Sequence, residues 1–389
     1  MGRVANARRR RWQRQATVKY FDYSLLAVVI FLVCFGLVML YSSSAYGAQI
    51  RFGDSMHFFR RQVYFALISI PAMIIVSKID YHIYVKLAVP IYFIAMFAKL
   101  LVLTPLGRTV SGARRWLDLP FGLQMQPSEI TKLAIILLIP LLACRLGKRA
   151  GEWRGVVQIL VWGGAASVAV FFFTDNLSTA IIVMGITCVL IFVIHPRTLP
   201  FVAITVAAGL SMIVGLNLIM AQIDDGGGNF RMRRIAAWLR PYEFMTTDNF
   251  QTMQGLYAIG SGGFFGKGLG NSAQNRIIPE VQNDMIFAII GEELGVFGAI
   301  VVLVLFGMLL YRLLFIARNA PDIYGSLVVT GIFVHIAIQV ILNIAVVLRI
   351  IPTTGVGLPF ISSGGTALLF LMLEMGIALS VSNQIKFEE

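Results

Sequence analysis

The sequence predicts an all-α polytopic membrane protein with about ten membrane-spanning helices, and three observations support this. First, 58% of the 389 residues are hydrophobic and only 13% are charged, whereas about a quarter of the residues of a soluble domain are charged. Second, apolar runs long enough to cross a bilayer recur along the whole chain. Third, the basic residues gather in short clusters between those runs, as they do in membrane proteins.

Composition also excludes several classes of protein. The net charge of +13 does not indicate nucleic-acid binding, because the basic residues are divided among short loops. The three cysteines, Cys34, Cys144 and Cys188, lie in or at the ends of apolar runs, so we expect no disulfide framework. The four histidines are scattered singly, and no zinc motif can be built from them.

We expect a basic tail, residues 1–20, followed by a single membrane domain, residues 21–389. The apolar run after the tail is too long for the core of a signal peptide, so it should remain as the first span. Since a span needs about 20 apolar residues, we place ten of them near 22–43, 60–78, 83–103, 128–144, 155–173, 177–194, 199–221, 285–313, 324–348 and 362–382.

Lysine and arginine in the short loops predict the orientation of these spans. The tail holds seven basic residues, and further ones follow spans four, six and eight. Ten spans place all of them on one side, so both termini are predicted to be cytoplasmic. Two long segments, 104–127 and 222–284, then face outward, the second between spans seven and eight. Their arginines are either functional or exempt from the charge rule because the loops are large.

Span four contains charged residues at membrane depth. Its unbroken apolar stretch, 133–144, covers only about 18 Å at 1.5 Å per residue, so the span must include Glu129 and Lys132. These two residues lie three apart on a helix and can pair. Charges at this depth are costly and are usually functional or paired with each other. Both a functional pair and a purely structural ion pair remain open.

Span eight places Asp284 at its outer mouth, with Glu292 and Glu293 about 12 Å deeper. The two glutamates are explained by a functional role or by helix packing with buried partners. Asp284 directly precedes the helix, where an acid also stabilises a helix N-terminus. A structural role for Asp284 is therefore the alternative to a catalytic one.

The large outer segment contains the string NFRMRRIAAWLRP. Its Arg233, Arg234 and Arg240 lie at helical spacing beside the membrane, which suits a phosphate or diphosphate group. The alternative is contact with anionic lipid.

Two glycine-rich segments complete the set of candidate site elements. GSGGFFGKGLG lacks the Lys-Ser/Thr ending of a P-loop, so nucleotide binding is not expected, and we expect its glycines to turn tightly against a substrate. PTTGVGLPFISSGG lies between spans nine and ten. Irregular backbone at membrane depth is tolerated where it is buried or lines a cavity, so this segment is predicted to help form one.

Taken in order, these segments resemble the SEDS family (shape, elongation, division and sporulation proteins), and the resemblance covers nearly the whole chain. GARRW and the SSSA run are more similar to the division branch than to the elongation branch. The matching strings are SSSA at 42–45, GARRWLDL at 112–119, QPSEITKLA at 126–134, RRIAAWLRP at 233–241, GSGGFFGKGLGNS at 260–272, IPEVQNDMIFAIIGEELG at 278–295 and PTTGVGLPFISSGGTA at 352–367.

The resemblance implies a peptidoglycan glycosyltransferase that polymerises lipid II at the outer face of the bacterial cell membrane. The family's essential acid matches Asp284, and its paired acid and lysine match Glu129 and Lys132. The candidate substrate-binding residues in the matching strings are Arg233, Arg234, Arg240, Glu129, Lys132, Arg115, Lys267 and Ser362.

In this reading, Asp284 is the general base that takes a proton from the attacking sugar hydroxyl in an inverting transfer. The leaving diphosphate needs its charge stabilised by arginines, by Lys132 or by a divalent cation, Mg²⁺ or Mn²⁺, and no other cofactor is expected. A flippase or transporter for the same lipid is the competing class, and an inactive scaffold is a third.

Family membership also implies partners and a location. The expected partners are lipid II, a class B penicillin-binding protein that crosslinks the strands, and other division proteins. The expected location is the bacterial cell membrane at the division septum.

Overall fold

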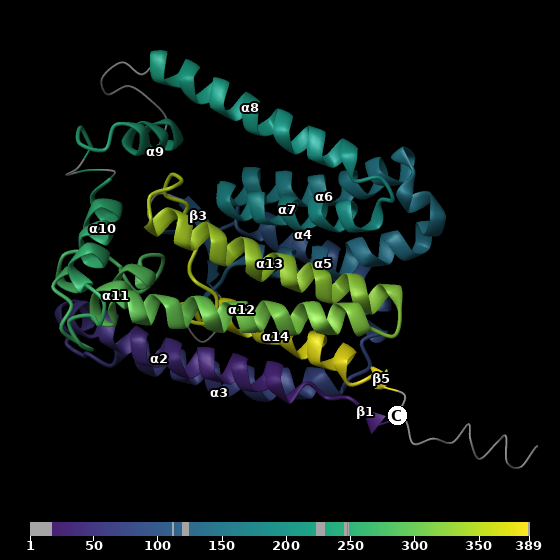
Figure 1. Cartoon of the computed structure of the whole chain (residues 1–389), viewed down its shortest axis with the longest axis horizontal. Coiled ribbons are helices and arrows are strands. Elements are labelled where there is room, and N and C mark those ends of the chain that lie inside the picture. The colour runs from purple at the N-terminus through teal and green to yellow at the C-terminus, as the bar shows by residue number, and fades with distance from the viewer. Residues whose placement is uncertain are drawn as a thin grey trace, which may run out of the picture.

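A computed structural model describes residues 18–110, 113–118, 124–222, 230–244, 247 and 249–387. This part of the chain is almost entirely helical, and its long helices run side by side (Figure 1). The fold class predicted from the sequence is therefore confirmed. The predicted basic tail, residues 1–20, lies outside the described residues except for its last three.

Nine described helices are long and apolar enough to cross a membrane. A further helix, α8 (Leu199–Gln222), occupies predicted span seven, and its apolar segment among the described residues is Leu199–Ser211. The nine are α2 (Tyr23–Phe52), α3 (His57–Lys78), α4 (Ile83–Leu101), α5 (Pro127–Leu146, extended by the 3₁₀ turn η2, Gly147–Gly151), α6 (Trp153–Thr174), α7 (Leu177–Ile194), α12 (Gly295–Asn319), α13 (Ile323–Val347) and α14 (Gly365–Ser382).

Predicted span eight is wrong as a single helix. The chain forms a short helix α11 (Ile286–Glu293), breaks at Leu294, and starts α12 at Gly295. Gly295 has a φ of +68°, which favours glycine, and a Cβ there would lie 2.4 Å from the backbone nitrogen of Gly266. The close backbone contact with a distant segment therefore requires a glycine at the break.

The predicted outer segment 104–127 contains a small sheet. Strands β2 (Gly107–Val110), β3 (Ala113–Asp118) and β4 (Gln124–Met125) pair antiparallel in that order. Leu117 of β3 is buried against Ala98 and Val102 at the end of α4. The sheet is thus fixed to the helix bundle.

The second predicted outer segment, 222–284, contains α9 (Phe230–Leu239), α10 (Phe250–Gly262) and the 3₁₀ turn η3 (Gln274–Arg276). These elements lie with α11 at one end of the bundle (Figure 1), and we call this end, with the sheet β2–β4, the loop end. At the opposite end, β1 (Val18–Lys19) pairs with β5 (Lys386–Phe387), so the beginning and end of the described chain lie together.

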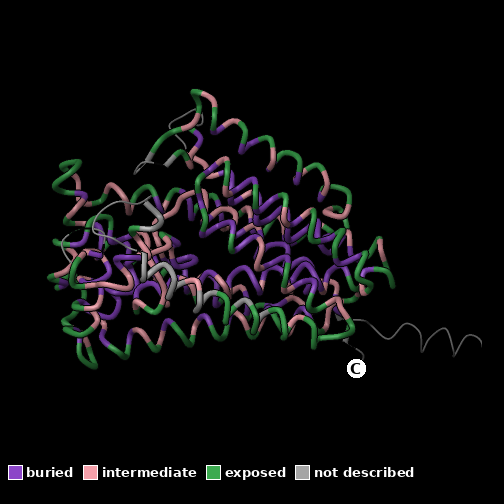
Figure 2. The backbone as a smooth tube through the Cα atoms, turned by 90° about the horizontal axis from the view of Figure 1, so that it is seen from above, coloured by how far each residue is buried: buried purple, intermediate pink, exposed green. Residues whose placement is uncertain are grey.

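The core of the bundle is formed by α5, α13 and α14, whose residues are mostly buried, while the outer helices expose one side (Figure 2). α5 packs against α4, α6, α7, α13 and α14. Pro127 at its first position fits a helix start, because that residue needs no backbone donor. The central position of α5 explains why its charged residues lie inside protein rather than against lipid.

Candidate active site

A cavity of about 380 Å³ lies at the loop end, and we call it the central cavity. Its wall is rich in amide and hydroxyl side chains, which suit the hydroxyl groups of a sugar. Its lining residues include Phe58, Arg61, Gln62, Trp116, Gln124, Gln126, Glu129, Lys132, Asn176, Thr179, Glu280, Gln282, Asn283, Gln339, Ser362, Ser363 and Thr366.

Glu129 and Lys132 form the pair that their spacing predicted. The Lys132 Nζ lies 2.9 Å from the Glu129 Oε2, and both side chains are more than nine-tenths buried. Both residues line the central cavity. The structure therefore confirms an ion pair at the cavity wall, and its role in substrate binding stays a prediction.

Asp284 precedes α11 and is partly buried. Its neighbours Gln282 and Asn283 line the central cavity, whereas Asp284 is not among the residues that line it. The segment that carries Asp284 is held against the glycine-rich loop 352–364, because the Ser363 N–H donates to the Gln282 carbonyl at 2.9 Å.

Two amides of α13 hold the same loop, and sequence reasoning missed both. Asn343 Nδ2 donates to the Asp284 carbonyl and to the Val356 carbonyl, each at 2.8 Å, and its side chain is fully buried. One turn earlier, Gln339 Nε2 donates to the Gly357 carbonyl at 3.0 Å. The available signal was two polar residues four apart in an otherwise apolar helix, since such groups need partners in a membrane.

The surroundings of Asp284 favour the neutral carboxyl group. Removal from water raises the pKa of Asp284, although the positive charge of Arg234 and a backbone hydrogen bond act in the opposite direction. A carboxylate with a raised pKa is a stronger base than an ordinary one, which suits proton abstraction near neutral pH.

A second cavity of about 580 Å³ lies beside the first, and we call it the side cavity. Its wall is largely apolar, and it carries two of the predicted arginines. Arg115 donates to the Asp175 carbonyl and Arg234 to the Thr353 carbonyl, each at 3.1 Å. Asn176 lines both cavities. The lining residues are Arg115, Asp175, Asn176, Leu177, Ser178, Ile181, Arg234, Ile235, Leu342, Ile351, Pro352, Thr353 and Thr354.

The other two predicted arginines of the outer segment, Arg233 and Arg240, line neither cavity. Arg233 is exposed, and Arg240 lies 3.5 Å from the Glu243 carboxylate. Trp238 Nε1 donates to the Arg349 carbonyl at 3.0 Å, and Arg349 Nη2 donates back to the Trp238 carbonyl at 2.6 Å. This exchange fixes α9 beside the end of α13. Of the three predicted arginines, Arg234 is the one that lines either cavity.

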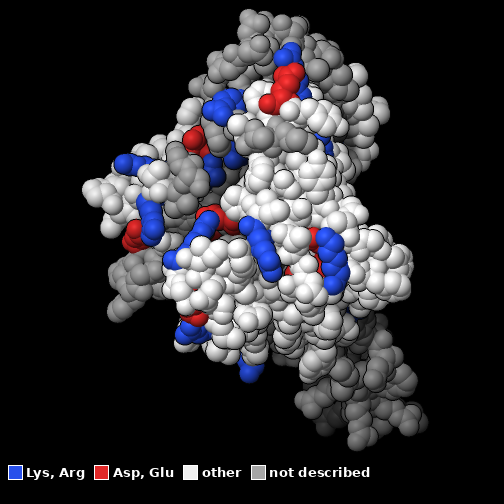
Figure 3. All heavy atoms as spheres, turned by 90° about the vertical axis from the view of Figure 1, so that its left-hand side faces the viewer, with Lys and Arg blue, Asp and Glu red and all other residues white. Residues whose placement is uncertain are grey.

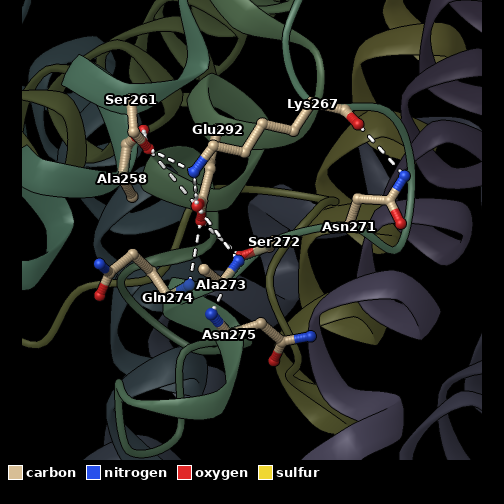
Figure 4. A network of polar contacts seen from close by, with 9 residues as sticks. All are labelled: Ala258, Ser261, Lys267, Asn271, Ser272, Ala273, Gln274, Asn275 and Glu292. Carbon is tan, nitrogen blue, oxygen red and sulfur yellow. Dashed lines mark hydrogen bonds and ion pairs between the residues drawn. The ribbon is translucent and has the colours of Figure 1, made fainter.

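Lys267 is paired with a buried acid. Its Nζ lies 2.7 Å from the Glu292 Oε1 (Figure 4), and it lines neither cavity. Glu292 is fully buried and also accepts from Ser272 Oγ and from the N–H groups of Ala273 and Gln274. The substrate-binding role of Lys267 stays a prediction, and the structure gives it a structural partner.

The expectation that the glycines of 260–272 turn against a substrate stays a prediction, and the structure gives two of them a packing role. They pack against the break between α11 and α12, where the Lys267 and Gly268 N–H groups donate to the Glu292 and Glu293 carbonyls at 2.9 Å. A Cβ at Gly266 would lie 2.1 Å from the Glu293 carbonyl oxygen. Gly266, and Gly262 beside the Gly291 carbonyl, are thus required by backbone packing. Glu293 likewise has a partner, because the half-buried Ser42 Oγ donates to it at 2.7 Å.

Loop 352–364 forms the wall predicted for it. Ser362 lines the central cavity, and its Oγ accepts from the Leu358 N–H at 2.7 Å. A Cβ at Gly357 would lie 2.9 Å from the Ser362 Cβ and 3.4 Å from the Asn283 carbonyl oxygen. Glycine therefore lets this loop approach the segment that carries Asp284.

Viewed from the loop end, basic side chains are spread over the surface and several lie next to acidic ones (Figure 3). One of the basic residues of this end, Arg61 of α3, lines the central cavity and was not singled out from the sequence. Among the described residues, no three His, Cys, Asp or Glu side chains come together as a metal site.

The fold and these cavities define a class of protein. It is a polytopic membrane protein with a polar and an apolar cavity side by side at one end, and the loop between them is bound to the segment that carries Asp284. Residues 23–386 match the model of the cell cycle protein family FtsW/RodA/SpoVE, and the chain belongs to this family.

Curated relatives cover nearly the whole chain. Stage V sporulation protein E of Bacillus subtilis (strain 168) is 38% identical over 369 residues, which are 94% of this chain and 98% of that protein. The probable peptidoglycan glycosyltransferase FtsW of Geobacter sp. (strain M18) is 33% identical over 376 residues, which are 95% of this chain and 98% of that protein.

Solved structures share the fold. A chain from the structure of a peptidoglycan synthase complex that coordinates polymerization and crosslinking matches with a TM-score of 0.75 and 24% identity, covering 93% of this chain and 97% of that one. The rod shape determining protein RodA of Thermus thermophilus matches with a TM-score of 0.64 and 24% identity, covering 95% and 98%.

Proposed function

We propose that the chain is a peptidoglycan glycosyltransferase that polymerises lipid II, with Asp284 as its general base. The observation that carries this proposal is the position of Asp284: its backbone is clamped by Asn343 to the loop that divides two cavities. Family relatives named probable peptidoglycan glycosyltransferase support the activity. Both termini are proposed to be cytoplasmic, so that the loop end faces outward.

The reaction joins two lipid-linked saccharides. The acceptor's sugar hydroxyl attacks the anomeric carbon of the donor from the side opposite the diphosphate, and its proton passes to the Asp284 carboxylate. The bond between the anomeric carbon and the diphosphate oxygen breaks, and the electron pair leaves with the diphosphate. Arg115 and Arg234, which line the side cavity, supply positive charge for that leaving group. A second catalytic acid is unnecessary, because a diphosphate leaves without protonation.

A divalent cation, Mg²⁺ or Mn²⁺, fits this chemistry as an additional proposal. Mg²⁺ is commonly held by one or two carboxylates together with substrate phosphates. No carboxylate is assigned to it, because Glu280 at the wall of the central cavity already pairs with Arg51 at 3.3 Å. The cation would neutralise charge on the diphosphate, and a chelator that lowers the polymerisation rate would support its presence.

The biological setting follows the relatives. We propose that the protein works with a class B penicillin-binding protein, which crosslinks the strands it makes, and with other division proteins. Similarity to FtsW proteins and to a stage V sporulation protein favours a septal location.

Asp284→Asn tests the proposed base, because it keeps the size of the side chain and removes the proton acceptor. Purified protein with its penicillin-binding partner should make glycan from labelled lipid II, and the variant should make none while still inserting and folding. Asp54→Asn is the matched control, since Asp54 is an exposed acid at the same end that pairs with Arg60, and it should keep full activity. Undiminished synthesis by Asp284→Asn would rule out the assigned role.

A further inference from the structure

We propose that the side cavity binds the polyprenyl diphosphate of the donor, while the central cavity binds the saccharide of the acceptor. This inference rests on the proposed function and names which cavity serves which substrate. It is carried by the different chemistry of the two walls, by the loop that divides them, and by the position of Asp284.

The side cavity combines an apolar wall with two arginines. Leu177, Ile181, Leu342 and Ile351 supply the apolar surface. Arg115 comes from the sheet and Arg234 from α9, and the bonds of each to a backbone carbonyl orient both guanidinium groups. One acid, Asp175, also lines this cavity, so its two arginines leave it with an excess of positive charge. A positively charged end joined to an apolar pocket suits an anionic head with a hydrocarbon tail. At about 580 Å³, the cavity has room for a diphosphate and the start of a lipid chain.

The central cavity has a different character. Its charged residues balance, because Lys132 is paired with Glu129 at 2.9 Å and the wall also carries one further basic residue, Arg61, and one further acid, Glu280. Amides such as Gln62, Gln126 and Gln282 line the wall. Neutral donors and acceptors of this kind recognise sugar hydroxyls and acetamido groups better than they stabilise a leaving diphosphate.

The wall between the cavities is the beginning of the glycine-rich loop. Thr353 and Thr354 line the side cavity, and the next residues, Gly355 and Val356, line the central one. Asn343 joins the Val356 carbonyl to the Asp284 carbonyl. The backbone of Asp284 is thus tied to the dividing loop, and its neighbours Gln282 and Asn283 line the central cavity. In this proposal the Asp284 carboxylate takes the proton of an acceptor hydroxyl that meets the anomeric carbon of the donor at this boundary.

The charge distribution decides which substrate goes where. Only the donor's diphosphate becomes a leaving group, so its oxygens gain negative charge in the transition state, whereas the acceptor's diphosphate takes no part in bond breaking. The two arginines of the side cavity, of which Arg234 also acts electrostatically on Asp284, are therefore more effective beside the donor. Asn176 lines both cavities, so the two lie next to each other.

The test separates donor from acceptor. Lipid II whose acceptor hydroxyl is capped by an additional sugar can serve only as donor, so its KM can be measured against a fixed concentration of uncapped acceptor. Arg115→Gln with Arg234→Gln should raise the KM for the capped donor roughly 10- to 100-fold, since each tenfold loss corresponds to about 1.4 kcal/mol and charge-assisted hydrogen bonds contribute that much or more. The KM for the acceptor should change less than about twofold.

Arg108→Gln is the control, because Arg108 lies in the same sheet, is exposed and pairs weakly with Asp118 at 3.9 Å. It should leave both KM values unchanged. An unchanged unfolding temperature of the double variant would show that the arginines act on binding rather than on folding.

Direct binding of polyprenyl diphosphate without a sugar tests the inference independently of catalysis. The wild type should bind this probe in detergent micelles, and the double variant should bind it at least tenfold more weakly. A larger effect on the acceptor than on the donor, or probe binding that does not depend on the arginines, would overturn the assignment. Loss of ordinary anionic phospholipid binding with unchanged polyprenyl diphosphate binding would make the cavity a membrane-lipid site. If the wild type binds the probe through the arginines but makes no glycan, the proposed function and the donor and acceptor roles fail, while polyprenyl diphosphate binding in the side cavity stands.

Discussion

The buried carboxylate of Glu292 is expected to be a main support of the loop end. It is fully buried and accepts hydrogen bonds from Lys267, Ser272, Ala273 and Gln274 (Figure 4). Glu292→Gln keeps the size of the side chain but places an NH₂ group against N–H donors. Because unsatisfied buried groups cost about 1–3 kcal/mol each, we expect a loss of about 3 kcal/mol in the free energy of unfolding.

Lys267→Met should lower the free energy of unfolding by less than Glu292→Gln does. Its side chain is 35% exposed, so solvent screens much of the attraction, and Glu292 keeps its other donors. We expect a loss of about 1–2 kcal/mol in the free energy of unfolding. The loss in the double variant should be about 1 kcal/mol smaller than the sum of the two single losses, because the two residues share one interaction.

The measurement is denaturant unfolding in detergent micelles followed by circular dichroism, together with the rate of protease cleavage within 260–272. The exposed pair Arg60–Asp54 provides the control, and Arg60→Met should change stability by less than about 1 kcal/mol. If Lys267→Met instead weakens lipid II binding with unchanged stability, Lys267 contacts the substrate and the structural explanation is refuted.

Three further results are expected. Asn343→Leu should lower kcat about 10- to 100-fold with KM nearly unchanged, because Asp284 loses its clamp; a change in KM alone would contradict this, as measured by steady-state polymerisation. Asp284 acts as a base in its ionised form, and its pKa is raised above the usual 3.8. On acidification, kcat should therefore begin to fall at a higher pH than it would for an ordinary aspartate. A pH–rate profile in which kcat does not fall at acidic pH would argue against Asp284 as the base. Lys132→Met should destabilise the protein by about 3–5 kcal/mol by leaving Glu129 buried without its partner, and pairing it with Glu129→Met should recover much of the loss in denaturant unfolding; no recovery would show that the pair is not the cause.

The span positions could be predicted because the thickness of a bilayer sets the length of each apolar run. The Glu129–Lys132 pair was equally accessible, since residues three apart on a helix share a face. In both cases the deciding interaction is local in sequence.

Features that depend on distant contacts could not be predicted in this way. The break at Leu294 depends on backbone packing between Gly266 and Gly295, which no apolar pattern encodes. The strands β2, β3 and β4 span two to six residues each, which is too short for an alternating apolar pattern to be recognised. Asn343 carries no charge and has no partner near it in sequence, and its importance emerges once Asp284 and Val356 are seen on either side of it.

The central claim is that the chain joins saccharides at the loop end and does not carry lipid across the membrane. Sealed vesicles containing the protein with its penicillin-binding partner, and labelled lipid II in one leaflet, test this directly. We predict glycan when the lipid II lies in the leaflet next to the loop end, none when it lies in the other leaflet, and no lipid movement between the leaflets. Translocation of lipid II without any polymer would contradict the account and would identify a flippase.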